Sequence, residues 1–311
     1  MTPPPSIVIT QREGFSRSIQ SLQSVLQNTA PPHNLIYVDG GSPAPIRLEL
    51  EELSRIHGFQ LLRHDQFLSP NHAKELALPH VTGRYVAFLD NDVLVSNGWL
   101  ETLVACADET NAGVVAPLYL ELLGQESRLH MFGGLCHIRE TNGLRQLIVS
   151  HDSRKGSIPT DASRTRTEHI EMHGFLLRTS ILAQVQPFDP LVPTIPENAD
   201  FCLLMREVGQ EIWIEPNASV TVLLPEFLDD MDRAFHTQRW SDDWIRAGFQ
   251  HFTRKWRLSG PQPVLESQRR WAVAHRVVAY DNSLHRRLGI KSDSILNRRL
   301  LAPLEQALWG R

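Results

Sequence analysis

Two aspartates separated by one residue, Asp90 and Asp92, follow the apolar run "YVAFL". Side chains two positions apart on a strand point to the same face, so both carboxylates can hold one divalent cation, or one can bind metal and the other a hydroxyl group. Carboxylate oxygens suit a hard ion such as Mn²⁺ or Mg²⁺, which stabilises a pyrophosphate leaving group. The spacing alone is common in turns, but its position directly after a buried strand favours a metal site.

Polar residues also follow two earlier apolar runs. Thr10, Gln11, Arg12 and Glu13 come after "IVI", and Asp39 comes after "LIYV". In open sheets of parallel strands, ligands bind at the carboxyl ends of the strands. Three polar strand ends therefore predict one binding site, although Asp39 has a second explanation as a turn residue before a glycine pair.

The elements that must position these residues alternate along the chain. Apolar runs predict strands, and apolar residues at helical spacing predict helices between them. The predicted strands are 6–10, 34–42, 59–64 and 84–92, and the predicted helices are 15–26, 46–57 and 71–79. Such alternation indicates an α/β fold with a mainly parallel sheet and helices on both faces.

Several blocks in a fixed order resemble the nucleotide-sugar-dependent glycosyltransferases of family 2, which have the GT-A fold. The blocks are "IVITQRE", "VDGGS", "HVTGRYVAFLDNDVLVSNGWLETLV", "HGFLLRTSILAQVQPFDP" and "ENADFCLLMREVGQEIWIEPNASV". The resemblance covers residues 6–225. The segments "FLSPN" and "RWSDDW" are similar to a bacterial branch of that family.

The resemblance implies roles for the polar strand ends. Thr10, Gln11, Arg12 and Glu13 would wrap the base and ribose of a nucleotide, and Asp39 would contact a pyrimidine ring. Asp90 would be shared between hydroxyl groups of the donor and the metal, and Asp92 would bind Mn²⁺ or Mg²⁺ directly. The expected donor is a nucleoside diphosphate sugar, with a UDP-sugar preferred by resemblance only.

The sequence departs from the family pattern at the expected general base. The usual Glu-Asp pair is replaced by Glu197-Asn198, with Asp200 two residues later, and asparagine cannot take a proton. We assign the base to Glu197, with Asp200 as the alternative. Both acids also suit the first turn of a helix for structural reasons alone.

The metal site and the acceptor site are less complete in the sequence. Thr221 stands where many members have a metal-binding histidine, so the third ligand is left open between water and a histidine from the C-terminal region. His130 and His173 fall where the resemblance places acceptor-facing loops, and structural hydrogen bonding is the alternative for both.

The implied reaction is inverting, metal-dependent transfer of a hexosyl or related group to the hydroxyl group of a saccharide or lipid-linked acceptor. One alternative is a degenerate, non-catalytic binding module, favoured by Asn198 and by the absent histidine. Another is a sugar-phosphate nucleotidyltransferase. "TQREGFSRS" contains one glycine, which disfavours the glycine-rich loop of that class.

Charge and composition restrict the expected partners and the expected cellular location. The 311 residues carry a net charge of −4, yet residues 261–311 hold nine basic and four acidic side chains. The acidic body makes nucleic acid an unexpected partner, whereas the basic region suits peripheral contact with the inner face of a membrane. We expect a GT-A domain over 1–225 and a helical extension over 226–311. No signal peptide or membrane span is indicated, so the expected location is cytoplasmic.

Overall fold

The computed structural model describes residues 3–158, 162–224, 228–277, 283–291 and 294–309. The strands are β1 Ser6–Thr10, β2 Asn34–Gly40, β3 Gln60–His64, β4 Tyr85–Asp90, β5 Val93–Val95, β6 Val114–Leu123, β7 Glu126–Met131, β8 Cys136–Thr141, β9 Leu144–Val149, β10 Thr165–Thr167, β11 Gly174–Arg178 and β12 Ile212–Leu224. The helices are α1 Ser18–Asn28, α2 Ala44–His57, α3 Pro70–Ala77, α4 Trp99–Thr110, α5 Glu197–Glu207, α6 Asp230–Arg239, α7 Asp242–Lys255, α8 Pro263–Arg276, α9 Leu284–Arg287 and α10 Ala302–Trp309.

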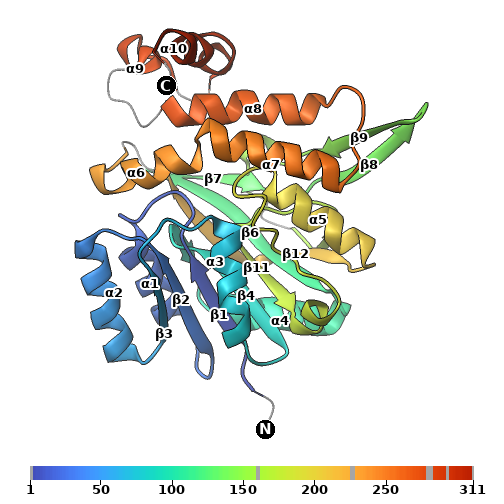
Figure 1. Cartoon of the computed structure of the whole chain (residues 1–311). Helices are drawn as coiled ribbons and strands as arrows, with labels where there is room; N and C mark the ends of the chain where they lie inside the picture. Colours follow the sequence, from blue (N-terminus) through green and yellow to red (C-terminus); the bar gives the residue numbers. More distant parts are fainter. Residues whose placement is uncertain (1–2, 159–161, 225–227, 278–282, 292–293, 310–311) are drawn as a thin grey trace.

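One mixed sheet of ten strands forms the centre of the molecule (Figure 1). Its order is β10-β12-β6-β11-β4-β1-β2-β3, with β5 beside β12 and β7 beside β6. The strands β4, β1, β2 and β3 are parallel, as predicted, whereas β11 runs antiparallel to β4 and to β6. The predicted α/β fold with a mostly parallel sheet flanked by helices is confirmed.

The two faces of the sheet bury separate cores. On β1, Val8 belongs to one buried cluster while its neighbours Ile7 and Ile9 belong to the other. Neighbouring side chains of a strand point to opposite faces, so this division means that both faces of β1 are covered. A continuous apolar run such as "IVI" is what a strand covered on both faces requires.

Helices α6, α7 and α8 lie across one end of the sheet, where β1, β2 and β4 have their carboxyl ends (Figure 1). Phe235 of α6 belongs to one of the two buried clusters, and Phe252 of α7 and Leu265 of α8 belong to the other. The helical extension therefore shares its core with the sheet. The predicted boundary at residue 225 lies outside the described residues and stays a prediction.

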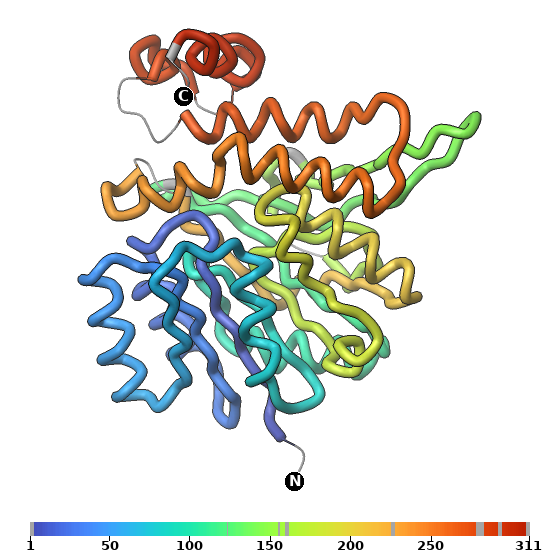
Figure 2. Tube along the Cα trace, viewed as in Figure 1, coloured from blue at the N-terminus to red at the C-terminus, as the bar shows by residue number. Residues whose placement is uncertain are grey.

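The hairpin of β8 and β9 reaches the connection between α7 and α8, and the two segments lie side by side in Figure 2. The backbone N–H of Arg145 donates to the hydroxyl of Ser259 at 3.0 Å, and that of Leu147 donates to the side-chain oxygen of Gln262 at 3.1 Å. These bonds fix the extension from the side opposite α6. Among the described helices, none is long and apolar enough to cross a membrane.

Candidate active site

The carboxyl ends of β1 and β4 meet at the edge of the sheet beneath α6. Thr10 pairs with Asp90 in the parallel ladder, and the backbone N–H of Asn91 donates to the carbonyl of Thr10 at 2.9 Å. The antiparallel strand β11 begins at the same edge, where the N–H of Asp90 donates to the carbonyl of His173 at 3.0 Å. The topology thus brings His173 to the end of the strand that carries Asp90.

Asp90, Asp92 and His173 form a buried group whose ligand atoms lie within 4.8 Å of one another. His173 Nδ1 lies 2.9 Å from Asp90 Oδ2, which fixes the orientation of the imidazole ring. Asp92 lies beyond the end of β4, in the turn before β5, so a turn rather than a shared strand face brings the two carboxylates together. Asp90 Oδ1 and Asp92 Oδ1 are buried, and neither has a hydrogen-bond partner among the described residues.

The electrostatics of the two carboxylates differ. Burial, together with the charges of Asp90 and Glu13, raises the pKa of Asp92 to about 8. Burial alone would also raise the pKa of Asp90, but the charge of Arg12 and the hydrogen bond from His173 outweigh it and hold that pKa below its ordinary value. A carboxyl group that is costly to ionise next to another carboxylate is one that a bound divalent cation would stabilise. The residues present therefore fit a cation held by oxygen atoms.

The side chain between the two aspartates holds the loop after β1. Asn91 Nδ2 donates to the carbonyl of Gly14 at 2.6 Å and to the hydroxyl of Ser18 at 2.8 Å. Its Oδ1 accepts the backbone N–H of Arg12 at 3.0 Å. Asn91 thus connects the segment of Asp90 and Asp92 to the predicted nucleotide loop after β1.

Arg12 connects that loop to the start of α5. Its Nε lies 3.4 Å from Asp90 Oδ2, and its Nη1 donates to Glu197 Oε1 at 3.0 Å. Arg239 of α6 donates to the same Glu197 oxygen at 3.0 Å. Glu197 is 1% exposed, and its Oε2 has no hydrogen-bond partner among the described residues. Glu197 therefore joins the Asp90 group through Arg12 and keeps one oxygen unengaged.

Asp200, the alternative base, contacts different residues from those that contact Glu197. Its Oδ2 accepts from Lys255 Nζ at 2.7 Å, and its Oδ1 accepts from Trp256 Nε1 at 2.7 Å. Burial raises the pKa of this carboxyl group, and the charge of Lys255 opposes that effect. Both oxygens are engaged, so the contacts of Asp200 anchor the end of α7 to α5.

Of the other predicted nucleotide contacts, Asp39 and Gln11 already have hydrogen-bond partners, whereas the hydroxyl of Thr10 has none among the described residues. Asp39 Oδ2 accepts from Arg63 at 2.6 Å and from the hydroxyl of Ser42 at 2.7 Å. Gln11 Nε2 donates to the carbonyl of Leu68 at 2.9 Å, which ties the loop to the segment before α3. Thr10 Oγ1 is buried without a hydrogen-bond partner among the described side chains.

His130 lies next to the group in a cluster of histidines and acids. Its Nδ1 is 2.7 Å from Glu121 Oε1, and its ring centre is 5.5 Å from that of His173. Asn198 Nδ2 donates to Glu171 Oε2 at 3.0 Å. Burial acts to raise the pKa of Glu171, but His151 and other nearby histidines outweigh it and lower the pKa to about 2. Asn198 therefore holds a carboxylate that comes from the segment before β11.

Four residues of this region did not emerge from the sequence as functional: Asn91, Lys74, Glu171 and Arg239. Lys74 of α3 is fully buried, its Nζ has no hydrogen-bond partner among the described residues, and burial lowers its pKa despite the charges of Asp90 and Glu197. Its place on the apolar side of a predicted helix was an available signal. For Glu171 and Arg239 no signal existed, because their partners are distant in the sequence.

Comparison with known sequences identifies the family. The sequence model of a family described as glycosyl transferase family 2 matches residues 6–174, more than half of the chain. A pre-mycofactocin glycosyltransferase of Mycobacterium tuberculosis is 27% identical over 208 residues, which cover 67% of this chain and 39% of the relative. An uncharacterized glycosyltransferase of Rickettsia bellii is 28% identical over 106 residues, which cover 34% of this chain and 15% of the relative. The chain thus spans about two fifths of the first relative and less of the second.

Two similar solved structures show the fold. A crystal structure of GalNAc-T7 with UDP, GalNAc and Mn²⁺ has a TM-score of 0.56 at 15% identity, covering 83% of this chain and 55% of that one. A crystal structure of S. aureus TarS 1-349 in complex with UDP-GlcNAc has a TM-score of 0.51 at 15% identity, covering 89% of this chain and 81% of that one. With these sheets and helices in common, the chain has the GT-A fold and belongs to glycosyl transferase family 2.

Proposed function

We propose that this chain transfers a sugar from a nucleoside diphosphate sugar, a UDP-sugar by preference, to a hydroxyl group of a saccharide or lipid-linked acceptor with inversion. The observation that carries the proposal is the buried group of Asp90, Asp92 and His173 at the carboxyl end of β4, in a chain of this family. The similar structures with UDP or UDP-GlcNAc support the choice of donor class.

Two buried cationic side chains suit the diphosphate of the donor. Arg12 and Lys74 both interact electrostatically with Asp90, at the edge where β1 and β4 end. Lys74 Nζ has no hydrogen-bond partner among the described residues, so it retains all of its donors for an anion. A buried cation without a bonded partner is costly unless a ligand compensates it. We assign Thr10 and Asp39 to the nucleoside end of the donor, as the resemblance implies.

Asp90, Asp92 and His173 would hold Mn²⁺ or Mg²⁺. Their unpartnered carboxylate oxygens fit such an ion, and His173 would supply the third ligand, in place of the water or the C-terminal histidine between which the sequence left it open. When bound, the ion supplies electrostatic stabilisation of the negative charge on the departing nucleoside diphosphate. The side chains themselves orient the donor and exclude water, because Asp90 and Asp92 are at most 4% exposed.

Glu197 is our choice for the general base. In the reaction the acceptor oxygen forms a bond to the anomeric carbon, the bond from that carbon to the diphosphate breaks, and the acceptor proton moves to the carboxylate. Glu197 Oε2 is unengaged, whereas both oxygens of Asp200 are bonded to Lys255 and Trp256. Asp200 stays the second candidate.

The proposal is tested by incubating the protein with UDP-, GDP- and dTDP-sugars in the presence of Mn²⁺ and following release of the free nucleotide. Slow hydrolysis of one donor, lost in Asp92→Asn, supports the transferase. If one nucleotide binds but no donor is consumed with any acceptor, the degenerate binding module takes its place.

We also propose a peripheral membrane contact through the C-terminal helices. Exposed apolar side chains, among them Leu288, Ile295 and Leu308, lie in the same region as exposed Arg287 and Lys291. Apolar side chains with nearby basic groups suit an anionic lipid surface. Sedimentation with vesicles containing phosphatidylserine, but not with phosphatidylcholine alone, is the expected result. If the protein sediments with neither kind of vesicle, the proposed membrane contact is wrong.

A further inference from the structure

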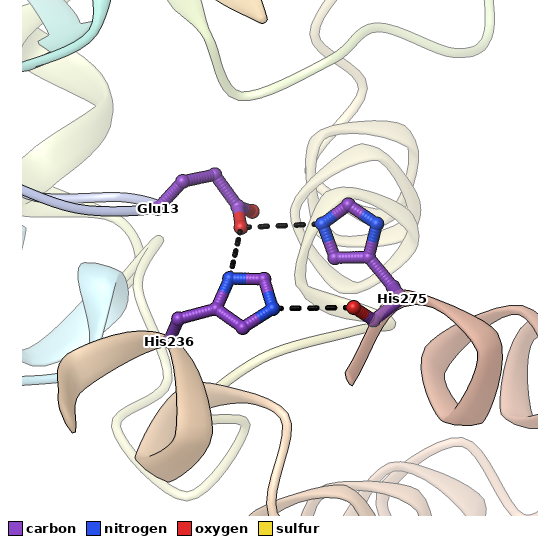
Figure 3. Close-up of side chains that lie close together, drawn as sticks. All are labelled: Glu13, His236 and His275. Atoms are coloured by element: carbon purple, nitrogen blue, oxygen red, sulfur yellow. Dashed lines mark hydrogen bonds and ion pairs between the residues drawn. The ribbon is translucent and has the colours of Figure 1, made fainter. Parts of the chain in front are cut away.

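Outside the Asp90 group, three metal-binding side chains from distant segments meet above the edge of the sheet. Glu13 comes from the loop after β1, His236 from α6 and His275 from α8 (Figure 3). Glu13 Oε2 lies 3.7 Å from His236 Nδ1 and 3.4 Å from His275 Nε2, and the three ligand atoms all lie within 4.8 Å of one another. Ligand atoms about 3.3 Å apart are expected around a tetrahedral zinc ion with bonds of about 2.0–2.1 Å.

The hydrogen bonds of His236 show which of its nitrogen atoms is free. Nε2 lies 3.2 Å from the main-chain carbonyl oxygen of His275 (Figure 3), and a carbonyl only accepts, so Nε2 carries the proton. In a neutral imidazole with its proton on Nε2, Nδ1 presents a lone pair. That lone pair faces a carboxylate oxygen with no proton between them. A cation between His236 Nδ1 and Glu13 Oε2 would bind both atoms and so relieve their repulsion.

The surroundings hold the three ligands in place. Trp240 Nε1 donates to Glu13 Oε2 at 3.1 Å, and Arg239 Nε lies 3.3 Å from Glu13 Oε1. The ring of His275 stacks on that of Trp271 at 4.6 Å between centres. Metal-bound imidazole groups commonly donate their other N–H to a backbone carbonyl, as His236 does, and metal-bound carboxylates are themselves hydrogen-bonded.

The charge and exposure of the group leave room for an ion. The guanidinium of Arg239 lies against the carboxylate of Glu13, with Nε 3.3 Å from Oε1. Arg239 also pairs with Glu197, so its single positive charge is divided between two carboxylates. Side chains of Glu13 and His275 are 25% and 32% exposed, so solvent reaches the group.

We propose that Glu13, His236 and His275 form a second metal site, separate from Asp90 and Asp92, that binds zinc or a similar divalent transition metal. Two imidazole groups and one carboxylate suit zinc, whereas the oxygen-rich Asp90 group suits Mn²⁺ or Mg²⁺. The site joins the loop after β1 to α6 and α8. Its role is to fix the helical extension over the sheet edge, and it does not depend on which sugar the protein transfers.

The test uses the full chain without a polyhistidine tag, stripped with a chelator and then titrated with Zn²⁺ against a chromophoric chelator. The central variant is His275→Gln, because glutamine keeps a hydrogen-bond donor for Glu13 but is a poor zinc ligand. His137→Gln is the matched control, since His137 is 25% exposed, close to the 32% of His275, and also lies against a glutamate, Glu168. Asp92→Ala reports on the other metal site.

We expect the wild type, His137→Gln and Asp92→Ala to bind one zinc ion with equal affinity and to gain thermal stability on zinc addition. His275→Gln should bind at least about 100-fold more weakly and lose that gain. Two results would overturn the proposal. One is zinc binding that Asp92→Ala abolishes and His275→Gln keeps. The other is a wild-type protein that retains no zinc and shows no shift in melting temperature.

Discussion

Among single residues, the acids predicted as metal ligand or general base divide according to whether their oxygen atoms already accept hydrogen bonds. Asp92 and Glu197 each have a buried oxygen with no hydrogen-bond partner among the described residues. Asp200 has both oxygens bonded, to Lys255 and Trp256. Unsatisfied buried acceptors are costly in a folded protein and are retained where a ligand completes them. The contrast favours a chemical role for Glu197 and a structural role for Asp200.

Exchange of each acid for its amide separates these roles. Glu197→Gln removes the proton acceptor, so we expect turnover to fall by about 10²–10⁴-fold with donor affinity changed by less than a few-fold. Asp200→Asn breaks a buried ion pair with Lys255, so we expect the free energy of unfolding to fall by about 1–3 kcal/mol with turnover largely kept. Steady-state kinetics and urea unfolding measure the two effects. A folded but inactive Asp200→Asn beside an active Glu197→Gln would reverse the assignment.

The sequence predicted which residue types gather at the strand ends, but not all of their partners. Asp90 and Asp92 were visible because they follow an apolar strand directly. The contact between Arg12 and Glu197 joins residues 185 positions apart, and no local pattern carries such information. His173 was predicted for the acceptor. That role stays a prediction, and the position of the ring against Asp90 shows that it also suits the metal.

Among the elements, the connection between α6 and the loop after β1 is the main link from the extension to the site. Asp232 Oδ1 accepts the backbone N–H groups of Phe15 at 2.5 Å and of Ser16 at 2.9 Å, and Oδ2 accepts the hydroxyl of Ser16 at 2.5 Å. Gly14 lies against the same side chain, where a Cβ atom would collide with Asp232. The helix thus shapes the loop that leads into α1.

Removal of this carboxylate should loosen the loop. Asp232→Ala leaves the N–H groups of Phe15 and Ser16 without acceptors, so we expect a loss of about 1–2 kcal/mol in the free energy of unfolding. The control is Asp230→Ala on the same helix, whose side chain is 94% exposed and whose loss should change stability by less than about 0.5 kcal/mol. Urea unfolding of both variants checks this. Equal losses would mean that the contact contributes nothing specific.

The first half of the sheet could be predicted element by element, and the second half could not. Strands β1 to β4 alternate with helices and pair in parallel, so periodicity was sufficient. Strand β11 inserts between β4 and β6, and β12 pairs with β6 across a register shift between Glu215 and Ser219. These pairings depend on long-range contacts that follow neither sequence order nor a simple period.

For the whole molecule, buried neutral histidines make stability depend on pH. Burial lowers the pKa of His169 to about 4, and His236 has a similarly lowered pKa of about 4. Below the ordinary pKa of about 6.5, the unfolded chain takes up protons that the folded chain does not. The contribution of these histidines is therefore complete above pH 6.5 and is lost as the pH falls toward 4.

His169→Gln isolates one of these groups outside the two proposed metal sites. Glutamine is neutral at both pH values and can still donate to the carbonyl of Ser150, which lies 3.2 Å from His169 Nδ1. Between pH 7 and pH 5, His169 should account for about 2 kcal/mol of lost stability, and the variant should lose that much less than the wild type. Urea unfolding at both pH values measures the difference. Parallel pH dependence of the two proteins would show that His169 titrates normally.

Several residues of the two proposed sites lie beyond the part of the chain that the family model matches. The family model ends at residue 174, whereas Glu197, Arg239 and both histidines of the proposed zinc site lie beyond it. The sequence predicted helices there from amphipathic spacing, but not that α6 supplies Arg239 to Glu197. Packing against a distant surface is set by shape, which a local pattern does not encode.

The most direct test of the central claim is calorimetric titration with UDP, GDP and dTDP, each with and without Mn²⁺, for the wild type and for Asp92→Ala. We expect one nucleotide, UDP by preference, to bind only with Mn²⁺. We also expect the substitution to abolish this binding, because the buried carboxylate that would hold the ion is gone. Binding that is equally strong without Mn²⁺, or that is unchanged in Asp92→Ala, would contradict a metal-dependent donor site at the end of β4.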